Sequence, residues 1–131
     1  LKSLNINLAL DLKQVIIYAQ KERLQQVFIN IILNALDAMP GGGQLSIQTR
    51  QQDGQAIIKI SDTGLGIKPE HLPRIFDPFF TTKGIGKGTG LGLSISFAII
   101  KEHEGQILVD SQVGQGTTFT IILPVNLAEK D

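Results

Sequence analysis

The feature that most constrains the fold is a change of hydrophobic period at residues 40–43, the sequence PGGG. Before it, from about residue 21 to 39, apolar residues have the spacing of an α-helix, which Pro40 and the glycines end. After it, QLSIQTRQQ and QAIIKISD alternate between apolar and polar residues around Asp53-Gly54, a dipeptide typical of hairpin turns. The sequence therefore predicts a helix over 21–39 followed by a β-hairpin.

Further segments of both kinds flank this unit. The predicted strands lie at about 4–18 (one or two short strands), 106–111 and 116–124, and the predicted helices lie at 68–76 and 91–104. No internal repeat or linker interrupts them. The order predicts one domain of the α+β class: a two-layer α/β sandwich, in which a mixed sheet of about five strands is covered on one face by about three helices.

The composition narrows the classes of function. The chain has 131 residues, 42% of them hydrophobic, which is enough for one domain with a core. Twelve basic and twelve acidic residues balance, so we expect neither nucleic acid nor direct membrane contact. There is no cysteine, which excludes disulfides and thiolate metal sites, and no apolar run is long enough to span a membrane. Because Leu1 stands where Met would be, we expect a piece of a longer protein.

Glycine is concentrated in SDTGLGI (61–67), GQGTTF (114–119) and, above all, TKGIGKGTGLGLS (82–94). In the last segment five glycines alternate from Gly84 to Gly92, with Lys83 and Lys87 among them, directly before a predicted helix. Backbone N–H groups at a helix N-terminus, approached closely because glycine has no side chain, form an anion site, usually for phosphate. A flexible surface loop is the alternative interpretation.

The familiar phosphate motifs do not fit this segment. A Walker loop needs a lysine after its second glycine, and no lysine follows Gly90. The pattern G-x-G-x-x-G fails in every register, because Thr89, Leu91 and Leu93 occupy the third glycine position, and the protein-kinase glycine loop fails for the same reason. If the segment holds phosphates, it therefore belongs to another ATP-binding family.

A line of amides interrupts the apolar helix of residues 21–39. Gln26, Asn30 and Asn34 recur every four residues and so lie along one helix face. Mg²⁺ takes oxygen ligands and draws several of them from water and phosphate, so a neutral amide oxygen would suffice beside a triphosphate. Alternatively, these amides pair with backbone groups or face water. The two interpretations are close to balanced, because each unsatisfied buried amide costs about 1–3 kcal/mol.

Two further polar residues stand at strand ends. Asp62 ends a predicted strand, where its carboxylate could accept a hydrogen bond from an exocyclic amine and so distinguish adenine from guanine. Taken alone, it reads more readily as a turn residue. Thr117, at the start of the last strand, could add a polar group near such a base, or be an ordinary β-prone residue.

In order, these segments resemble the catalytic, ATP-binding domain of sensor histidine kinases, of the superfamily that includes DNA gyrase, mismatch-repair ATPases and an ATP-dependent heat-shock chaperone (the Bergerat, or GHKL, fold). NIILNALDAM resembles the N box, DTGLGI the first glycine box, FDPFF the F box and GKGTGLGLS the second glycine box, and GQGTTFTIILP is similar to the closing strand. The resemblance covers residues 4–124, and the NALDAM form resembles the nitrogen-regulation-type subgroup.

The resemblance implies roles for individual residues. Asn34 matches the Mg²⁺ ligand, Asn30 faces the same phosphates, Asp62 matches the adenine-reading aspartate, and Lys83 and Lys87 reach the phosphates from a mobile ATP lid over 77–92. Of these, Asn30 and Lys83 are the candidate catalytic residues. The implied nucleotide-binding set is Asn30, Asn34, Asp62, Gly64, Gly66, Ile67, Phe80, Lys83, Lys87, Gly88, Thr89, Gly90, Leu91, Gly92, Leu93 and Thr117. Aromatic residues of the F box, Phe76, Phe79 and Phe80, would anchor or steer the lid, and Phe79 and Phe80 would partly face the phosphoacceptor domain.

Asn30 also bears on the reaction. In ATPases and serine kinases of the superfamily, a glutamate at this position acts as general base; an amide cannot accept a proton at neutral pH. This favours a histidine kinase over an ATPase or serine kinase. One departure is Asp37, where many members carry a basic residue. His71 and His103 are expected to be surface or capping residues, because the phosphoacceptor histidine of this family lies in a separate helical domain.

The resemblance thus implies the cofactors ATP and Mg²⁺. The implied partners are a phosphoacceptor histidine domain of the same protein or its dimer partner and, indirectly, a response regulator. The implied location is cytoplasmic, either as a soluble protein or as the cytoplasmic part of a membrane-anchored sensor. Two alternatives stay open: an ATPase or serine kinase of the same fold, and a nucleotide-sensing or protein-binding module.

Overall fold

The computed structural model describes residues 5–80 and 92–125. Five strands form one sheet in the order β1-β2-β3-β5-β4, and β1 and β2 are parallel while the other neighbours are antiparallel. The strands are β1 (Ile6–Leu12), β2 (Gly43–Gln52), β3 (Gln55–Asp62), β4 (Gln106–Gln112) and β5 (Gly116–Pro124). The helices are α1 (Lys21–Asp37) and α2 (Gly92–Glu102), with a 3₁₀ turn, η1 (Leu72–Arg74), between β3 and α2.

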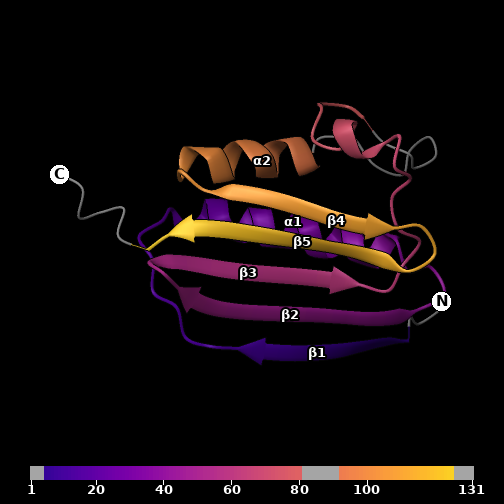
Figure 1. Cartoon of the computed structure of the whole chain (residues 1–131), viewed down its shortest axis with the longest axis horizontal. Helices are drawn as coiled ribbons and strands as arrows, with labels where there is room; N and C mark the ends of the chain where they lie inside the picture. Colours follow the sequence, from indigo (N-terminus) through magenta and orange to yellow (C-terminus); the bar gives the residue numbers. More distant parts are fainter. Residues whose placement is uncertain (1–4, 81–91, 126–131) are drawn as a thin grey trace.

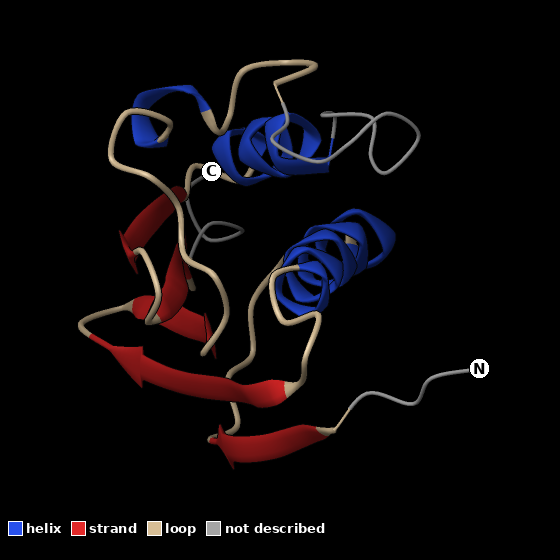
Figure 2. Ribbon diagram, turned by 90° about the vertical axis from the view of Figure 1, so that its right-hand side faces the viewer, coloured by secondary structure: helices blue, strands red, loops and turns tan. Residues whose placement is uncertain are grey.

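Both α-helices lie on the same face of the sheet, so the predicted two-layer α+β sandwich is confirmed (Figures 1 and 2). The predicted hairpin is also confirmed: β2 and β3 pair in register around Asp53 and Gly54, which have positive φ angles of 55° and 76°. Two positive φ values in succession match the twist of antiparallel strands, which explains why a short turn suffices.

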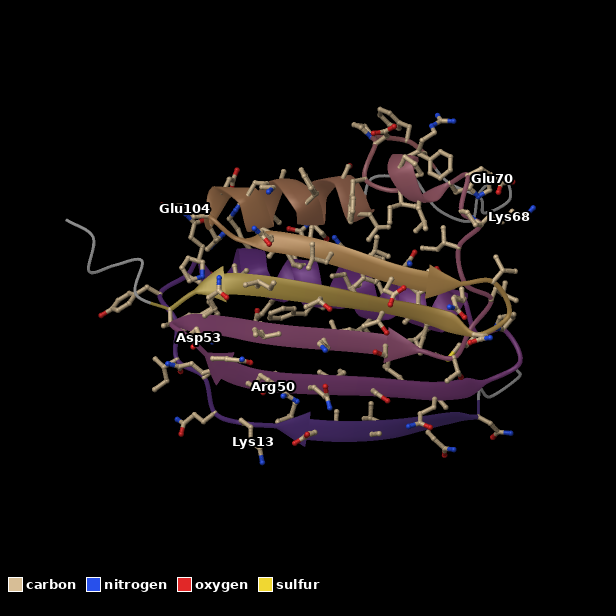
Figure 3. The ribbon with its side chains drawn as sticks, viewed as in Figure 1. Lys13, Arg50, Asp53, Lys68, Glu70 and Glu104 are labelled. Atoms are coloured by element: carbon tan, nitrogen blue, oxygen red, sulfur yellow. The ribbon has the colours of Figure 1, made fainter. Side chains whose placement is uncertain are left out.

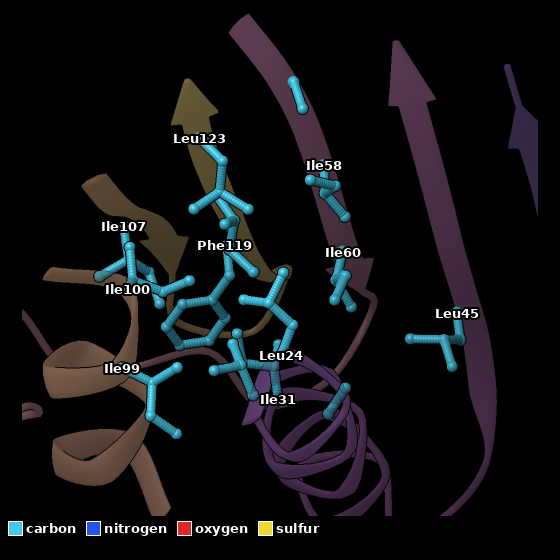
Figure 4. Close-up of a cluster of buried hydrophobic side chains, with 14 of the residues drawn as sticks. Leu24, Ile31, Leu45, Ile58, Ile60, Ile99, Ile100, Ile107, Phe119 and Leu123 are labelled. Atoms are coloured by element: carbon cyan, nitrogen blue, oxygen red, sulfur yellow. The ribbon is translucent and has the colours of Figure 1, made fainter. Parts of the chain in front are cut away.

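The core is formed by the alternate residues of the strands that face the helices. In β5 these are Thr117, Phe119, Ile121 and Leu123, all buried, and α1 contributes Leu24, Val27, Ile31 and Ala35 at helical spacing. Figure 4 shows Phe119 between the two helices and the sheet, close to Ile31, Ile99 and Ile100. The strand alternation therefore fixes which residues at the ends of the sheet also face the helices.

The structure differs from the sequence predictions at three places. Residues 4–18 were predicted to hold one or two short strands; their described part contains one, but it ends at Leu12 rather than near residue 18. Instead of a helix over 68–76, only the 3₁₀ turn Leu72–Arg74 forms, because Pro73 has no N–H to donate and disfavours helical geometry in the residue before it. The described residues thus contain two α-helices rather than about three. Helix α2 ends at Glu102, before Glu104 adopts a positive φ of 58°.

Candidate functional site

A row of polar residues crosses the sheet where β3 ends. Ser111 of β4 is paired with Thr117 of β5, and Thr117 is paired with Asp62 of β3. In β3 the helix-facing positions are Ala56, Ile58, Ile60 and then Asp62. The carboxyl group of Asp62 therefore occupies a position that the strand otherwise gives to core residues, and the residue is only 8% exposed.

The Asp62 carboxylate is held by backbone donors and by no cation among the residues that the structure describes. Its Oδ1 accepts a hydrogen bond from the Gly64 N–H at 2.8 Å, and no salt bridge joins it to a described residue. Burial raises the pKa of Asp62 above its ordinary value, and hydrogen bonds from the backbone N–H groups of Gly64 and Thr117 offset part of that rise. A buried carboxylate without a cation marks a candidate ligand-binding group.

Gly64 and Gly66, the two glycines after Asp62, allow their loop to pack closely between the end of α1 and the β4–β5 turn. A Cβ on Gly64 would lie 2.3 Å from the Ala38 carbonyl oxygen, and a Cβ on Gly66 would lie 2.2 Å from that of Gln112. The Leu65 N–H donates to the Ala38 carbonyl at 2.9 Å. Both glycines were predicted to let the backbone close around a base; what their contacts show is that they let the loop pack closely on its neighbours.

A hydroxyl network supports the same loop from the sheet. The Ser111 hydroxyl donates to the Gly116 carbonyl at 3.1 Å, so its oxygen accepts from the Ile67 N–H at 2.8 Å and from the Thr117 hydroxyl at 2.8 Å. Ile67 and Thr117, both predicted site residues, are therefore brought together beside Asp62. Ser111 was missed, because its importance depends on its being paired with Thr117, which the sequence does not show.

The two asparagines of α1 have different surroundings. The Asn30 Nδ2 donates to the Gly92 carbonyl oxygen at 3.2 Å and to the Ser96 hydroxyl at 3.4 Å. Asn34, one turn later and half-buried, has no side-chain hydrogen bond to another described residue. Asn30 therefore agrees in part with the alternative interpretation, since it pairs with a backbone group, whereas no other described residue bonds the Asn34 amide.

Of the second glycine box, only the end lies in the described residues. Gly92 begins α2 beside Asn30, and Leu93 packs against the core. The other predicted residues of this segment, Lys83, Lys87, Gly88, Thr89, Gly90 and Leu91, lie outside the described residues.

The three F-box phenylalanines take three different positions. Phe76 is half-buried against the core, with ring centroids 5.2 Å from Phe97 and 6.5 Å from Phe119. Phe80 contacts the His71 ring edge-on at 5.4 Å, and the Arg74 guanidinium lies 4.7 Å from the Phe80 ring centre. Phe79 is 72% exposed and has a positive φ of 67°. Of the three, Phe79 is the one that offers a large apolar surface to another molecule.

Of the two histidines, His103 is a buried capping residue rather than a surface one. Its Nε2 accepts from the N–H of Gln20, the N-cap residue of α1, at 3.1 Å, and its Nδ1 donates to the Ile99 carbonyl at 2.8 Å. An Arg23–Glu102 salt bridge joins the same ends of α1 and α2. His71 is half-buried against Phe80.

One cavity of about 490 Å³ lies away from these groups, between the N-terminal half of α1 and the start of β3. It is lined mostly by apolar side chains and by Lys13, which Figure 3 shows at the end of the molecule opposite Lys68 and Glu70. Residues 5–80 and 92–125 contain no cluster of three or more His, Asp or Glu side chains that could hold a metal ion, and none of their helices could cross a membrane.

Comparisons with known proteins agree with one another. Residues 19–127 match the family model "Histidine kinase-, DNA gyrase B-, and HSP90-like ATPase". The chain is 50% identical over 111 residues to the signal transduction histidine-protein kinase AtoS of Escherichia coli K12, covering 84% of this chain and 18% of that protein. The chain spans a quarter or less of the length of its curated relatives.

Two solved structures have the same fold. The catalytic domain of histidine kinase ThkA superposes with a TM-score of 0.82 at 33% identity, covering 92% of this chain and 81% of that one. Full-length ShkA in complex with AMPPNP superposes with a TM-score of 0.80 at 30% identity, covering 91% of this chain and 25% of that one.

Proposed function

The chain belongs to the histidine kinase-, DNA gyrase B- and HSP90-like ATPase family, with the fold of a histidine kinase catalytic domain, and from this we propose that it binds Mg²⁺-ATP and donates the γ-phosphoryl group to a histidine on a separate helical domain. It would thereby form the kinase half of a two-component sensor. Because ATP and response regulators are cytoplasmic, we place the domain on that side of any membrane.

The observation that carries the proposal is the buried Asp62 carboxylate. It lies at the end of β3 beside Thr117, held by N–H donors and with no salt bridge to a described residue. A carboxylate oxygen accepts a hydrogen bond from the exocyclic amine of adenine, whereas guanine presents a carbonyl oxygen there and would repel it. The Gly64 and Gly66 backbone, packed on α1 and the β4–β5 turn, gives that contact a rigid support.

Asn34 is the proposed Mg²⁺ ligand. Its side chain, on α1, makes no hydrogen bond to another described residue, and its neutral amide oxygen is adequate because the triphosphate supplies the negative charge. Bound Mg²⁺ would neutralise charge on the phosphates. Lys83, and with it Lys87, would add positive charge to the same phosphates. Catalysis would depend mainly on positioning and charge neutralisation.

The surroundings of Asn30 favour phosphoryl transfer over hydrolysis. Its amide nitrogen is committed to the Gly92 carbonyl and Ser96, and an amide does not accept a proton at neutral pH. An attacking water would therefore gain no base at this position, while a neutral imidazole needs none here to attack. For the phosphoacceptor domain, the exposed Phe79 is the apolar contact that we propose.

The experiment is phosphoryl transfer from [γ-³²P]ATP. We expect the complete kinase to acquire acid-labile, base-stable label on histidine, and this chain alone to bind ATP without labelling itself or releasing phosphate appreciably. Phosphate release by the chain that Asn30→Ala abolishes would instead favour the ATPase or serine kinase alternative. A chain whose melting temperature does not respond to Mg²⁺-ATP would favour the non-enzymatic alternative.

A further inference from the structure

The contact between α1 and the start of α2 fixes which end of the Asn30 amide faces a ligand. The Gly92 carbonyl oxygen, 3.2 Å from the Asn30 side chain, can only accept a hydrogen bond. The amide nitrogen must therefore face α2, and the amide oxygen, on the other side of the same carbon, must face away from Gly92. An unrestrained asparagine beside a triphosphate would tend to present its N–H₂ group to the phosphate oxygens.

Ser96 holds this arrangement from inside the protein. It is fully buried in α2, where the other buried residues are Ile99 and Ile100. Its hydroxyl donates to the Gly92 carbonyl at 2.8 Å, so its oxygen is oriented to accept from the Asn30 Nδ2 at 3.4 Å. A serine that bonds the carbonyl four residues earlier is common in helices. Ser96 differs in that its hydroxyl also hydrogen-bonds the Asn30 side chain of the candidate site on α1, and this gives Ser96 a further role.

We propose that Ser96 is a positioning residue: with the Gly92 carbonyl it holds the Asn30 amide so that the oxygen, not the nitrogen, is offered to the Mg²⁺ end of the bound nucleotide. This inference rests on the proposed function. For Asn34, one turn further along α1, no described residue fixes which end of the amide faces the ion. One amide is thus preset and the other adjustable.

The test is the dependence of ATP affinity on Mg²⁺, measured by calorimetry as the ratio of the dissociation constant in EDTA to that in excess Mg²⁺. We expect Ser96→Ala to lower this ratio by about three- to tenfold, the effect of one hydrogen bond. We expect no further loss when Ser96→Ala is added to Asn30→Ala, because Ser96 acts through Asn30. The control is Ser61→Ala, which removes a hydroxyl bonded to Thr118 at 2.8 Å on the other face of the sheet and should leave the ratio unchanged.

The inference would be overturned if Ser96→Ala weakened ATP binding equally with and without Mg²⁺. It would also be overturned if the effects of Ser96→Ala and Asn30→Ala on the ratio of dissociation constants were additive in the double variant. In those cases the proposed function stands, whereas a wild-type chain that binds no ATP overturns both. Ser96→Cys keeps the side-chain volume but hydrogen-bonds only weakly, so it should lower the Mg²⁺ dependence of ATP binding as Ser96→Ala does. It therefore provides the same test if Ser96→Ala fails to fold. In the wild-type chain, the Asn30 side-chain N–H₂ protons should exchange with solvent more slowly than those of Asn34; equal exchange would contradict the restraint.

Discussion

Replacing Gly66 by alanine should damage both folding and nucleotide binding. Gly66 has a φ of +77°, and a Cβ there would lie 2.2 Å from the Gln112 carbonyl oxygen and 2.9 Å from the Val113 Cα. The left-handed conformation alone costs alanine about 1–2 kcal/mol. In addition, the new methyl group and Gln112 must separate by about 1.2 Å, from 2.2 Å to the 3.4 Å at which ordinary contact begins. We therefore expect a total loss of roughly 3 kcal/mol or more in the free energy of unfolding.

The displacement would reach the candidate site directly. Gln112 pairs with Gly116 at the end of β4, next to the Ser111–Thr117 pair that supports Ile67 and flanks Asp62. A shift of about 1 Å in positioning groups is enough to reduce activity about a hundredfold in enzymes. For binding by the folded variant, we expect ATP affinity to fall by about tenfold or more by the same argument.

Gly114→Ala is the matched control. Gly114 lies in the β4–β5 turn against which Gly66 packs. It has a φ of +81°, and a Cβ there would meet nothing within 4 Å. It should therefore show only the conformational cost of about 1–2 kcal/mol and keep its ATP affinity. Urea denaturation gives the free energies of unfolding, and calorimetric titration gives the affinities. Similar losses in the two variants would refute the reasoning, because the tight packing of Gly66 on Gln112 would then contribute nothing.

Three other variants address separate parts of the account. Because burial raises the pKa of Asp62, its contribution to stability is present in full below the unfolded value of 3.8 and is lost as pH rises through the folded value. Asp62→Asn should therefore be more stable than wild type at pH 7 without nucleotide. In thermal denaturation this difference in stability should shrink towards pH 4, and a constant difference would count against the prediction. Asn34→Ala should remove most of the Mg²⁺ dependence of ATP binding while metal-free affinity is kept, and intact binding and activity of the whole kinase would dismiss Asn34 as ligand. His103→Leu should cost about 1–3 kcal/mol in urea denaturation, because the Gln20 N–H loses its side-chain acceptor and the Ile99 carbonyl keeps only the backbone N–H of residue 103. A complete kinase carrying it should still label on histidine.

Most of the fold could be predicted from the sequence because the residues that the hydrophobic periodicity marks as apolar are also the ones buried in the core. The alternation in residues 44–62 and the Asp53-Gly54 turn specify a hairpin whose register then follows from which side chains are buried. The exception, residues 68–76, has helical composition around Pro69, but Pro73 limits it to one 3₁₀ turn. A proline within a short segment outweighs the propensity of its neighbours.

Site residues could be predicted only where a single polar residue stands out against its apolar sequence neighbours. Asn30, Asn34 and Asp62 stand out against apolar neighbours, but Ser111 and Ser96 are unremarkable in the sequence. Their importance depends on pairing with Thr117 across the sheet and with Asn30 across the helix interface, which are contacts between distant parts of the chain. Likewise, the sequence shows Asp62 at a strand end, but only the packed sheet shows it at a core-facing position.

The proposed function depends above all on recognition of the adenine of Mg²⁺-ATP by the buried Asp62 carboxylate. Its most direct test is calorimetric titration of this chain and of Asp62→Asn with ATP and with GTP, both in excess Mg²⁺. We expect one site on the wild-type chain that prefers ATP, and a loss of most of that preference in Asp62→Asn, whose amide can donate to the guanine carbonyl. Equal affinity of the wild-type chain for ATP and GTP, or an unchanged preference in Asp62→Asn, would contradict it.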